Sequence, residues 1–413
     1  PTPTPSSDKV AMTFNAGSEQ TKTTVLSTMD VAWLDTDRIA VFDGTAKNVF
    51  SITENNGTSA TFAGEGTKDA TDFYAAYPAA LATALNSGVI TTAIPSEQIV
   101  PEGKNIGDGA LVAVAHYEDD SFSFRNVPGV LKFTIAQEGI TSVTIGTMGG
   151  EPLSGTVEVT VGDAPAAQVI KGESYVTVKP ASGTFALGEY YAAVLPGTYA
   201  EGLTTVMTRS TDVLGGGNQS TAPATTVRNG GINLGDVKAI EWGTFIRTAA
   251  ELKNWSKSGD LSKPVIIGAD IEVGDWAGCF RESALTANFY GLGHKLYNIT
   301  YTPTSGPNSF LYQPQKQISN LYIGTRDGKT YDGVSKFTSA TTSNGYSELF
   351  TYTAAGTVMK NVVNFATFEA TSAKGGDSYV RIAGLVGAPN GGTFIGCKNC
   401  GKIVCSSTNT GET

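Results

Sequence analysis

The sharpest cluster of reactive side chains in this sequence is a group of three cysteines near its end: Cys397, Cys400 and Cys405. Thiolates at such short spacings can hold zinc, but a zinc site needs four thiolate or imidazole ligands. The fourth cysteine, Cys279, is distant in the sequence, and the histidines His116 and His294 fall in different predicted domains. Buried thiols, a disulfide and a metal site all stay open. We favour buried thiols, because Cys397 takes a position that apolar residues fill in a repeat described below.

Acidic side chains form the second candidate, because two carboxylates suffice for a glycosidase or a lyase. The candidates in the last predicted domain are Asp270, Glu272, Asp275, Asp327 and Asp332. Asp327 precedes a glycine, which is typical of a turn, and the other four are typical of loop residues on a solvated face. A Ser-His-Asp triad is not expected, since the two histidines lie in different predicted domains. We therefore predict no catalytic, cofactor-binding or metal-binding residue.

Two glycine-rich segments and four tyrosines complete the candidates. Residues 215–218 and 291–293 lack the strand-loop-helix context of a phosphate-binding loop, so we interpret their glycines as turn residues. The tyrosines could form an exposed strip that stacks on sugars: Tyr297, Tyr301, Tyr312 and Tyr322. Packing in a core or an interface is the commoner role of such side chains.

The composition limits the class of protein. The chain has 413 residues, of which 40% are hydrophobic and 16% charged, and its 49 glycines suit many short strands and turns. This length predicts two to three domains. The formal net charge of −10, without a cluster of lysine or arginine, argues against a nucleic-acid partner. No apolar run approaches the ~18–20 residues of a membrane span.

The strand pattern is clearest in residues 122–135, where apolar and polar residues alternate on both sides of a Pro-Gly pair. This predicts two strands, each with one buried face, at the seam between two β-rich blocks. Short strands separated by Gly, Pro and Asp recur through both blocks, which is typical of β-sandwiches. We therefore predict a flexible tether at residues 1–9 and sandwiches at 10–120 and 121–240. An Ala/Leu-rich stretch at 78–85 predicts a short helix or a helical turn within the first sandwich.

A different organisation is expected over residues 241–413. Thr248 and Glu251 form a capping-box pattern that predicts a helix over 248–256. Beyond it lies a weak repeat of four units. Each unit has an apolar pair, a polar loop, an apolar residue, two further residues and a closing apolar residue. The second of the two further residues is Asn in three of the four units. The closing residues are Ile299, Leu321, Val362 and Cys397. Stacked coils of about 20 residues with loop insertions would produce this repeat. The helix would then cover the open end of the first coil.

Four segments, taken in order, make the chain up to residue 240 similar to a known family. They are residues 33–42 (WLDTDRIAVF), 74–78 (YAAYP), 94–98 (IPSEQ) and 126–133 (NVPGVLKF). Together they resemble the fimbrillin-like (Mfa-like) surface proteins of Bacteroides-type bacteria. The later stretch, residues 383–404, looks like the Gly-Leu-Val-Gly repeats of bacterial surface β-helices.

The resemblance implies an all-β chain: two transthyretin-like β-sandwich domains, then a right-handed parallel β-helix with a short N-terminal capping helix. It also implies export as an outer-membrane lipoprotein whose only membrane contact is a lipid anchor upstream of residue 1. The Pro/Thr-rich start fits a tether left after removal of an export signal, although an arbitrary start of the sequence would look the same.

Subunits of this family are thought to join by strand exchange. An N-terminal strand is released by proteolysis, and a strand from a neighbour fills the open edge. The candidate leaving strand here is residues 10–14. No arginine precedes Arg38, so Lys9 or Lys22 would have to serve as the processing site. The appended β-helix suits a tip or accessory subunit better than a stalk subunit.

The first functional hypothesis is therefore a non-enzymatic adhesin of the cell surface, a fimbrial tip or accessory subunit. Its expected partners are other fimbrial subunits, bound by strand exchange, and a host or bacterial surface glycan or protein. The alternatives are a carbohydrate-active enzyme with carboxylates on the β-helix and a structural surface spacer. An enzyme needs a groove with two close carboxylates, whereas an adhesin needs only an exposed aromatic or polar strip.

Overall fold

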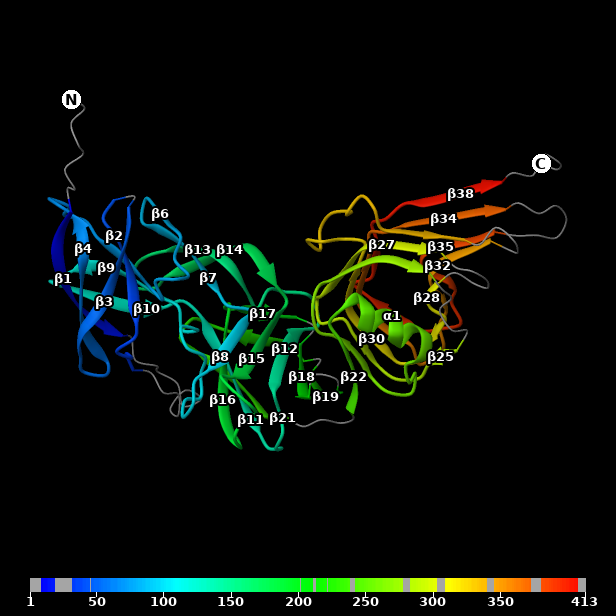
Figure 1. Ribbon diagram of the computed structural model, residues 1–413, viewed down its shortest axis with the longest axis horizontal. Helices are drawn as coiled ribbons and strands as arrows, with labels where there is room; N and C mark the ends of the chain where they lie inside the picture. The colour runs from blue at the N-terminus through cyan, green and yellow to red at the C-terminus, as the bar shows by residue number, and fades with distance from the viewer. Residues whose placement is uncertain are drawn as a thin grey trace, which may run out of the picture. The chain divides into compact units, whose positions relative to one another are not determined.

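The computed structural model describes residues 9–18, 32–44, 46–200, 202–210, 213–220, 222–237, 242–277, 283–302, 309–339, 345–372 and 380–407. In this part of the chain nearly every element is a strand, and α1 (Ala249–Ser258) is the one helix (Figure 1), which confirms the all-β prediction. The chain divides into two compact units. The first holds Pro1–Thr147, Glu151–Tyr199 and Pro223–Val237, and the second holds Met148–Gly150, Ala200–Ala222 and Lys238–Thr413.

Seven strands of the first unit close into a barrel in the order β1-β10-β9-β5-β2-β3-β4. They are β1 (Lys9–Ser18), β2 (Arg38–Phe42), β3 (Lys47–Asn55), β4 (Ser59–Thr67), β5 (Tyr74–Tyr77), β9 (Ala113–Glu118) and β10 (Ser121–Asn126). Alternation along β10 buries Phe122 and Phe124, which are 0% and 1% exposed, in a core rich in aromatic rings.

The segment 122–135 forms two strands, as its alternation predicts. The first, β10, belongs to the barrel, whereas the second, β11 (Gly129–Ile135), belongs to a separate sheet. There β11 pairs antiparallel with β16 (Gly188–Val194) and parallel with β21 (Gly231–Val237). The Pro128-Gly129 pair therefore lies where the chain passes from one sheet to another.

Short sheets make up the rest of the first unit. One follows the order β14-β13-β7-β6, with bounds Ala166–Glu173, Ser154–Thr160, Val89–Ile94 and Ala84–Asn86. In another, β15 (Tyr175–Pro180) pairs antiparallel with β12 (Ser142–Thr147) and parallel with β8 (Glu97–Val100). A small two-stranded sheet joins β17 (Gly197–Tyr199) to β20 (Ala224–Thr226).

Of the short helix or helical turn predicted at residues 78–85, only a turn is present. The Pro78 carbonyl accepts one hydrogen bond of 3.1 Å from the Leu81 N–H. The Thr83 N–H already donates to the Thr91 carbonyl at 2.8 Å, and the next residues form β6, with Leu85 opposite Ile90 in β7. Pairing in this hairpin overrides the helix preference of alanine and leucine.

The second unit begins with antiparallel strands β18 (Leu203–Ser210), β19 (Val213–Ser220) and β22 (Trp242–Ile246). Residues 215–218 lie inside β19, so the prediction that they form a turn is wrong. After β22 comes α1, where Thr248 and Glu251 form the predicted capping box. Leu252 and Trp255 on its apolar face are 0% and 3% exposed, which confirms the predicted helix and its buried side.

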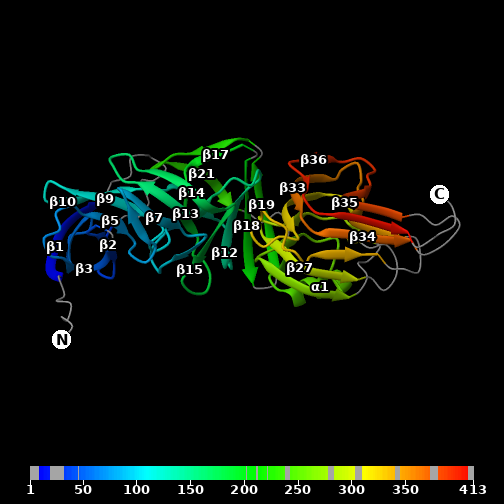
Figure 2. The ribbon, with the colours of Figure 1, turned by 90° about the horizontal axis from the view of Figure 1, so that it is seen from above.

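Parallel strands then stack coil upon coil in columns (Figures 1 and 2). The first column is β23 (Val265–Ile267), β26 (Phe289–Tyr290), β30 (Gln317–Ile323), β33 (Val358–Asn364) and β36 (Thr393–Ile395). The second is β24 (Ile271–Ala277), β27 (Lys295–Thr302), β31 (Lys336–Thr338), β34 (Thr367–Ser372) and β38 (Ile403–Ser407). The third is β28 (Ser309–Leu311), β32 (Gly345–Tyr352) and β35 (Val380–Ala388).

Two short strand pairs complete the coils. They join β25 (Ala284–Leu285) to β29 (Gln313–Pro314), and β33 to β37 (Lys398–Asn399). The helix packs on the first coil, where the Trp255 ring lies 5.9 Å from Phe289 and the Trp276 indole N–H donates to Ser256 Oγ at 3.3 Å. The predicted contact between the helix and the first coil is thus present.

The repeat in the sequence coincides with these coils. Leu321 lies opposite Val362 in the β30–β33 register, as expected of two closing residues in adjacent coils. The residue before each closing residue has positive φ: Asn298, Asn320, Asn361 and Gly396, at 52°, 51°, 50° and 62°. Among residues with a side chain, Asn tolerates this left-handed conformation best. The repeated Asn thus marks a corner that every coil turns in the same way.

Candidate functional site

The first strand, β1, is held along both of its edges. It pairs antiparallel with β4, from Lys9 opposite Thr67 to Gly17 opposite Ser59, and parallel with β10 over its last four residues. The predicted strand at 10–14 is therefore present but extends to Ser18. The sequence after Phe14 is polar and glycine-containing and carries no strand signal, so pairing with both β4 and β10 extends the strand.

One large side chain anchors β1 in the barrel. The Phe14 ring is 5% exposed and lies among four other aromatic rings. The centroid distances are 5.4 Å to Phe50, 5.1 Å to Phe73, 5.1 Å to Tyr117 and 5.0 Å to Phe122. Ala16 is buried on the same face, whereas Val10 is 38% exposed. The anchoring therefore lies in the second half of the strand.

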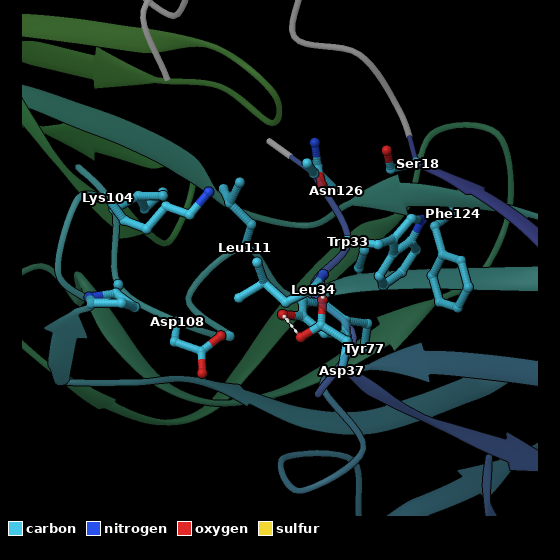
Figure 3. A pocket seen from close by; sticks show the side chains of 16 residues that line it. Ser18, Trp33, Leu34, Asp37, Tyr77, Lys104, Asp108, Leu111, Phe124 and Asn126 are labelled. Atoms are coloured by element: carbon cyan, nitrogen blue, oxygen red, sulfur yellow. Dashed lines mark hydrogen bonds between the residues drawn. The ribbon is translucent and has the colours of Figure 1, made fainter. Parts of the chain in front are cut away.

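A pocket opens in the first unit where β1 ends, and Figure 3 shows its lining. Its cavity volume is about 90 Å³, well below the ~300–1,000 Å³ range of small-ligand sites. Its apolar wall consists of Trp33, Leu34, Ile106, Leu111 and Phe124. Ser18, the last residue of β1, and Lys104 and Asp108 of the 101–111 loop also line it.

A buried carboxyl group lies at the base of this pocket. Asp37 is 7% exposed, and it accepts hydrogen bonds from the Leu34 N–H at 2.8 Å and the Tyr77 hydroxyl at 2.9 Å. Burial raises the pKa of Asp37, and nearby Asp108 acts in the same direction, while the two hydrogen bonds oppose the shift. Burial and the adjacent Asp37 likewise raise the pKa of Tyr77.

The indole of Trp33 joins the pocket to the barrel core. Its ring lies edge-on to Phe62 and Tyr77 at 5.2 Å and to Phe124 at 5.5 Å. Three segments that carry the sequence resemblance, 33–42, 74–78 and 126–133, therefore meet at one place. Sequence reasoning singled out these segments but missed the pocket, because no local pattern shows which loops meet.

Four of the five predicted carboxylates of the second unit accept hydrogen bonds from their own loop or from a neighbouring coil. Asp327 accepts from the N–H groups of Lys329 and Thr330, both at 2.8 Å. Although burial opposes it, these bonds hold the pKa of Asp327 well below its usual range. Asp332 accepts from the Asn298 N–H at 2.7 Å and from the Ser335 N–H at 2.7 Å. Both residues stabilise turns rather than line a groove.

The remaining three carboxylates differ in their surroundings. Asp270 accepts from the Lys295 N–H at 3.1 Å and lies 3.0 Å from His294 Nδ1. Burial opposes the shift, but His294 and Lys295 lower the pKa of Asp270. Glu272 accepts from Asn298 Nδ2 at 2.7 Å, and Asp275 is exposed.

Histidines and cysteines form no common site in the described residues. His116 lies in the first unit between Asp72 and Glu118, at 2.7 and 2.8 Å, and His294 belongs to the second unit. Across the described ranges, no group of three or more His, Cys, Asp or Glu residues could hold a metal ion.

The three cysteines of the last coil are free thiols. Cys397 is partly buried among the coils, as its repeat position predicts, and burial raises the pKa of its thiol. Cys400 and Cys405 are exposed, so the prediction of buried thiols is wrong for these two. Ala370, which pairs with Cys405 from the preceding coil, is only 1% exposed, so Cys405 is exposed because none of the described coils covers β38 on its other side. Cys279 lies outside the described residues.

The four predicted tyrosines do not share one exposed strip. Tyr301 is 0% exposed and packs between Trp276 and Phe337 in the core. The Tyr322 hydroxyl accepts from Asn361 Nδ2 at 3.0 Å. Tyr297 lies under the Arg326 guanidinium at 4.7 Å, and Tyr312 packs edge-on to Tyr352 at 5.3 Å.

Residues 291–293 form the predicted turn, in which the His294 N–H donates to the Gly291 carbonyl at 2.9 Å. A Cβ on Gly291 would collide with the Asn320 carbonyl of the next coil, so close coil packing requires this glycine. In the described residues, no helix is long and apolar enough to cross a membrane.

Comparison with known proteins gives little to set beside this geometry. No protein-family model and no curated protein matches the sequence. One similar solved structure is a protein proposed to act in cell adhesion, from Bacteroides ovatus, at 15% identity and a TM-score of 0.34. Another is the tip fimbrial protein Mfa3 from Porphyromonas gingivalis, with a C-terminal truncation, at 10% identity and a TM-score of 0.28. Each match covers 57% of this chain and 97% of the other. Both TM-scores lie below 0.5, so these likenesses carry no argument about fold or function.

Proposed function

We propose that this protein is a non-enzymatic adhesin of the bacterial surface, a fimbrial tip or accessory subunit that joins its neighbours by strand exchange. In this proposal β1 is the strand that is exchanged. The observation that carries it is the double pairing of β1, with β4 on one edge and β10 on the other, around the buried Phe14.

Loss of β1 would create a defined binding site. The edges of β4 and β10 would expose rows of unpaired N–H and C=O groups, which a strand from another chain can satisfy. The space left by Phe14, walled by Phe50, Phe73, Tyr117 and Phe122, would select a bulky apolar side chain at one position of that strand. Backbone pairing would provide the affinity for the incoming strand, and the space left by Phe14 would fix the register of that strand.

The second unit is then the displayed part. We interpret its columns of parallel strands as a right-handed parallel β-helix over residues 241–413, with α1 covering its first coil. By resemblance, we assign residues 10–120 and 121–240 to two transthyretin-like domains that follow a tether at 1–9. The ligand of the protein would be a host or bacterial surface glycan or protein. The protein would lie at the cell surface, held there by a lipid anchor upstream of residue 1.

Hydrolysis of sugars is the less favoured function. Four of the five candidate carboxylates already accept hydrogen bonds from their own loops or from the neighbouring coil. A carboxylate committed to backbone N–H groups is held ionised and is a poor proton donor.

An assembly assay tests the proposal. The chain is cut between Ser18 and Ala32 and incubated alone and with other fimbrial subunits, and detergent-resistant bands are then separated on a gel. A single added band with a sibling subunit supports a terminal subunit. A ladder from this chain alone would show a stalk-type polymer and would contradict the tip assignment. No higher band under either condition would contradict strand exchange.

A further inference from the structure

The pocket beside Trp33 lies at the end of β1, the strand that is exchanged in the proposed function. Ser18, the last residue of β1, lies opposite Phe124 in the parallel register with β10, and both residues line the pocket. A strand advances ~3.3 Å per residue. Any chain that occupies the β1 position therefore brings its next one to three residues to the pocket.

The wall of the pocket favours an apolar side chain. Its lining includes the apolar side chains of Trp33, Leu34, Ile106, Leu111 and Phe124, and Figure 3 labels all of these except Ile106. The two charged side chains at its rim, Lys104 and Asp108, have opposite signs, so the rim selects for neither charge. Asp37 at the base already accepts from Leu34 and Tyr77, so its carboxyl group has no need of a ligand.

We propose that this pocket receives an apolar side chain of the partner strand, one to three residues beyond its last pairing with β10. The partner is thus an extended peptide of defined pattern: apolar at the positions of Phe14 and Ala16, then apolar again just past the strand. This inference rests on the proposed strand exchange and adds a determinant of which subunit fits.

The experiment uses the whole chain, nicked by a specific protease at a recognition sequence placed between Ser18 and Ala32, so that both pieces remain present. Labelled peptides carry the sequence of residues 9–18 followed by three residues. The three are all serine in one peptide, and in the others leucine replaces the first, second or third serine. Exchange into the nicked protein is followed by fluorescence anisotropy.

At least one leucine peptide should bind ~10-fold more tightly than the all-serine peptide, as expected for the transfer of one leucine side chain into an apolar site. Leu111→Ser should reduce this advantage to less than twofold. Leu187→Ser, which changes an exposed leucine of the first unit that does not line the pocket, should leave it intact.

The other outcomes separate the two proposals. Equal binding of all peptides, or a leucine advantage that survives Leu111→Ser, overturns the pocket inference and leaves strand exchange in place. If no peptide enters the nicked protein, strand exchange itself is contradicted, and the pocket inference with it. Thermal unfolding of each nicked variant verifies that a loss of binding does not come from loss of the fold.

Discussion

Asn361 donates a hydrogen bond of 3.0 Å from its side-chain Nδ2 to Oδ1 of Asn320, one coil earlier, and both residues have positive φ, at 50° and 51°. The two amides thus stack at equivalent corners of adjacent coils. Asn361 Nδ2 also lies 3.0 Å from the Tyr322 hydroxyl, so one side chain links its corner to two residues of the coil below. Each corner needs the left-handed conformation, and Asn meets this need while its amide binds the neighbouring coil.

Replacement of Asn361 separates these two contributions. Asn361→Gly keeps the left-handed conformation at low cost and loses the hydrogen bonds, so the free energy of unfolding should fall by about 1 kcal/mol. Asn361→Ala loses both, and should cost a further ~1 kcal/mol. Urea unfolding monitored by tryptophan fluorescence measures the two values. Equal losses of unfolding free energy in the two variants would contradict the expected cost of the left-handed conformation in Asn361→Ala.

Phe14 should carry most of the side-chain anchoring of β1. Phe14→Ala leaves a cavity among four aromatic rings and should cost ~3–5 kcal/mol of barrel stability. Val10→Ala, on the same strand but at a side chain that is 38% exposed, should change stability by less than ~0.5 kcal/mol. Hydrogen exchange of the β4 and β10 amides reports whether the strand opens more often in Phe14→Ala. Similar exchange in both variants would show that backbone pairing alone holds β1.

Asp37 should stabilise the loop before β2 through hydrogen bonds rather than charge. Asp37→Ala leaves the Leu34 N–H and the Tyr77 hydroxyl without a partner and should cost about 1–3 kcal/mol. Asp37→Asn keeps an acceptor and should cost less.

The pH dependence of stability tests the same residue. Burial raises the pKa of Asp37 above 3.8, so the folded state binds more protons than the unfolded state between 3.8 and the raised value. Its contribution to the free energy of unfolding therefore falls as pH rises through that window. Asp37→Asn should remove this fall, and an unchanged pH profile in that variant would contradict the assignment.

The buried pair of Glu348 and Arg381 should be strongly asymmetric to mutation. The Glu348 side chain is 0% exposed, and the Arg381 guanidinium also lies over Tyr346 and Tyr352, at 4.7 and 5.1 Å. Arg381→Ala leaves a buried carboxylate unpaired and should cost ~3 kcal/mol or more. Lys336→Ala, which breaks a partly exposed pair with Glu369, is the matched control and should cost ~0–1 kcal/mol. Chemical denaturation compares them, and equal costs would contradict this argument.

His116 should titrate above the usual range of histidine. The hydrogen bond to Asp72 raises its pKa, burial opposes the shift, and Glu118 raises it further. Stability from the protonated ring is fully present below ~6.5, the unfolded pKa, and is lost as pH rises through the higher folded value. An NMR titration of the ring protons should show the pKa fall in Asp72→Asn. A folded pKa at or below 6.5 in the unmodified protein would contradict the role of the two carboxylates.

Features that depend on neighbouring residues were predictable from the sequence. The capping box of Thr248 and Glu251 starts α1, because its hydrogen bonds close within four residues. Alternation in residues 122–135 predicts two strands, because burial on one face imposes period 2 whatever the partner strand is. The repeat with Asn298, Asn320 and Asn361 is also visible in the sequence. Its physical cause, a corner in the left-handed conformation, is visible only in the tertiary structure.

Features that depend on distant pairing were decided by the tertiary structure. The segment 122–135 divides between two sheets because β10 pairs with β1, whereas β11 pairs with β16 and β21. The pocket arises in the same way, since Trp33, Tyr77 and Leu111 come from segments that no local pattern brings together. Local hydrogen bonds and periodicity depend only on short stretches of sequence. Strand partners and cavities instead depend on which of many possible long-range pairings buries the most apolar surface.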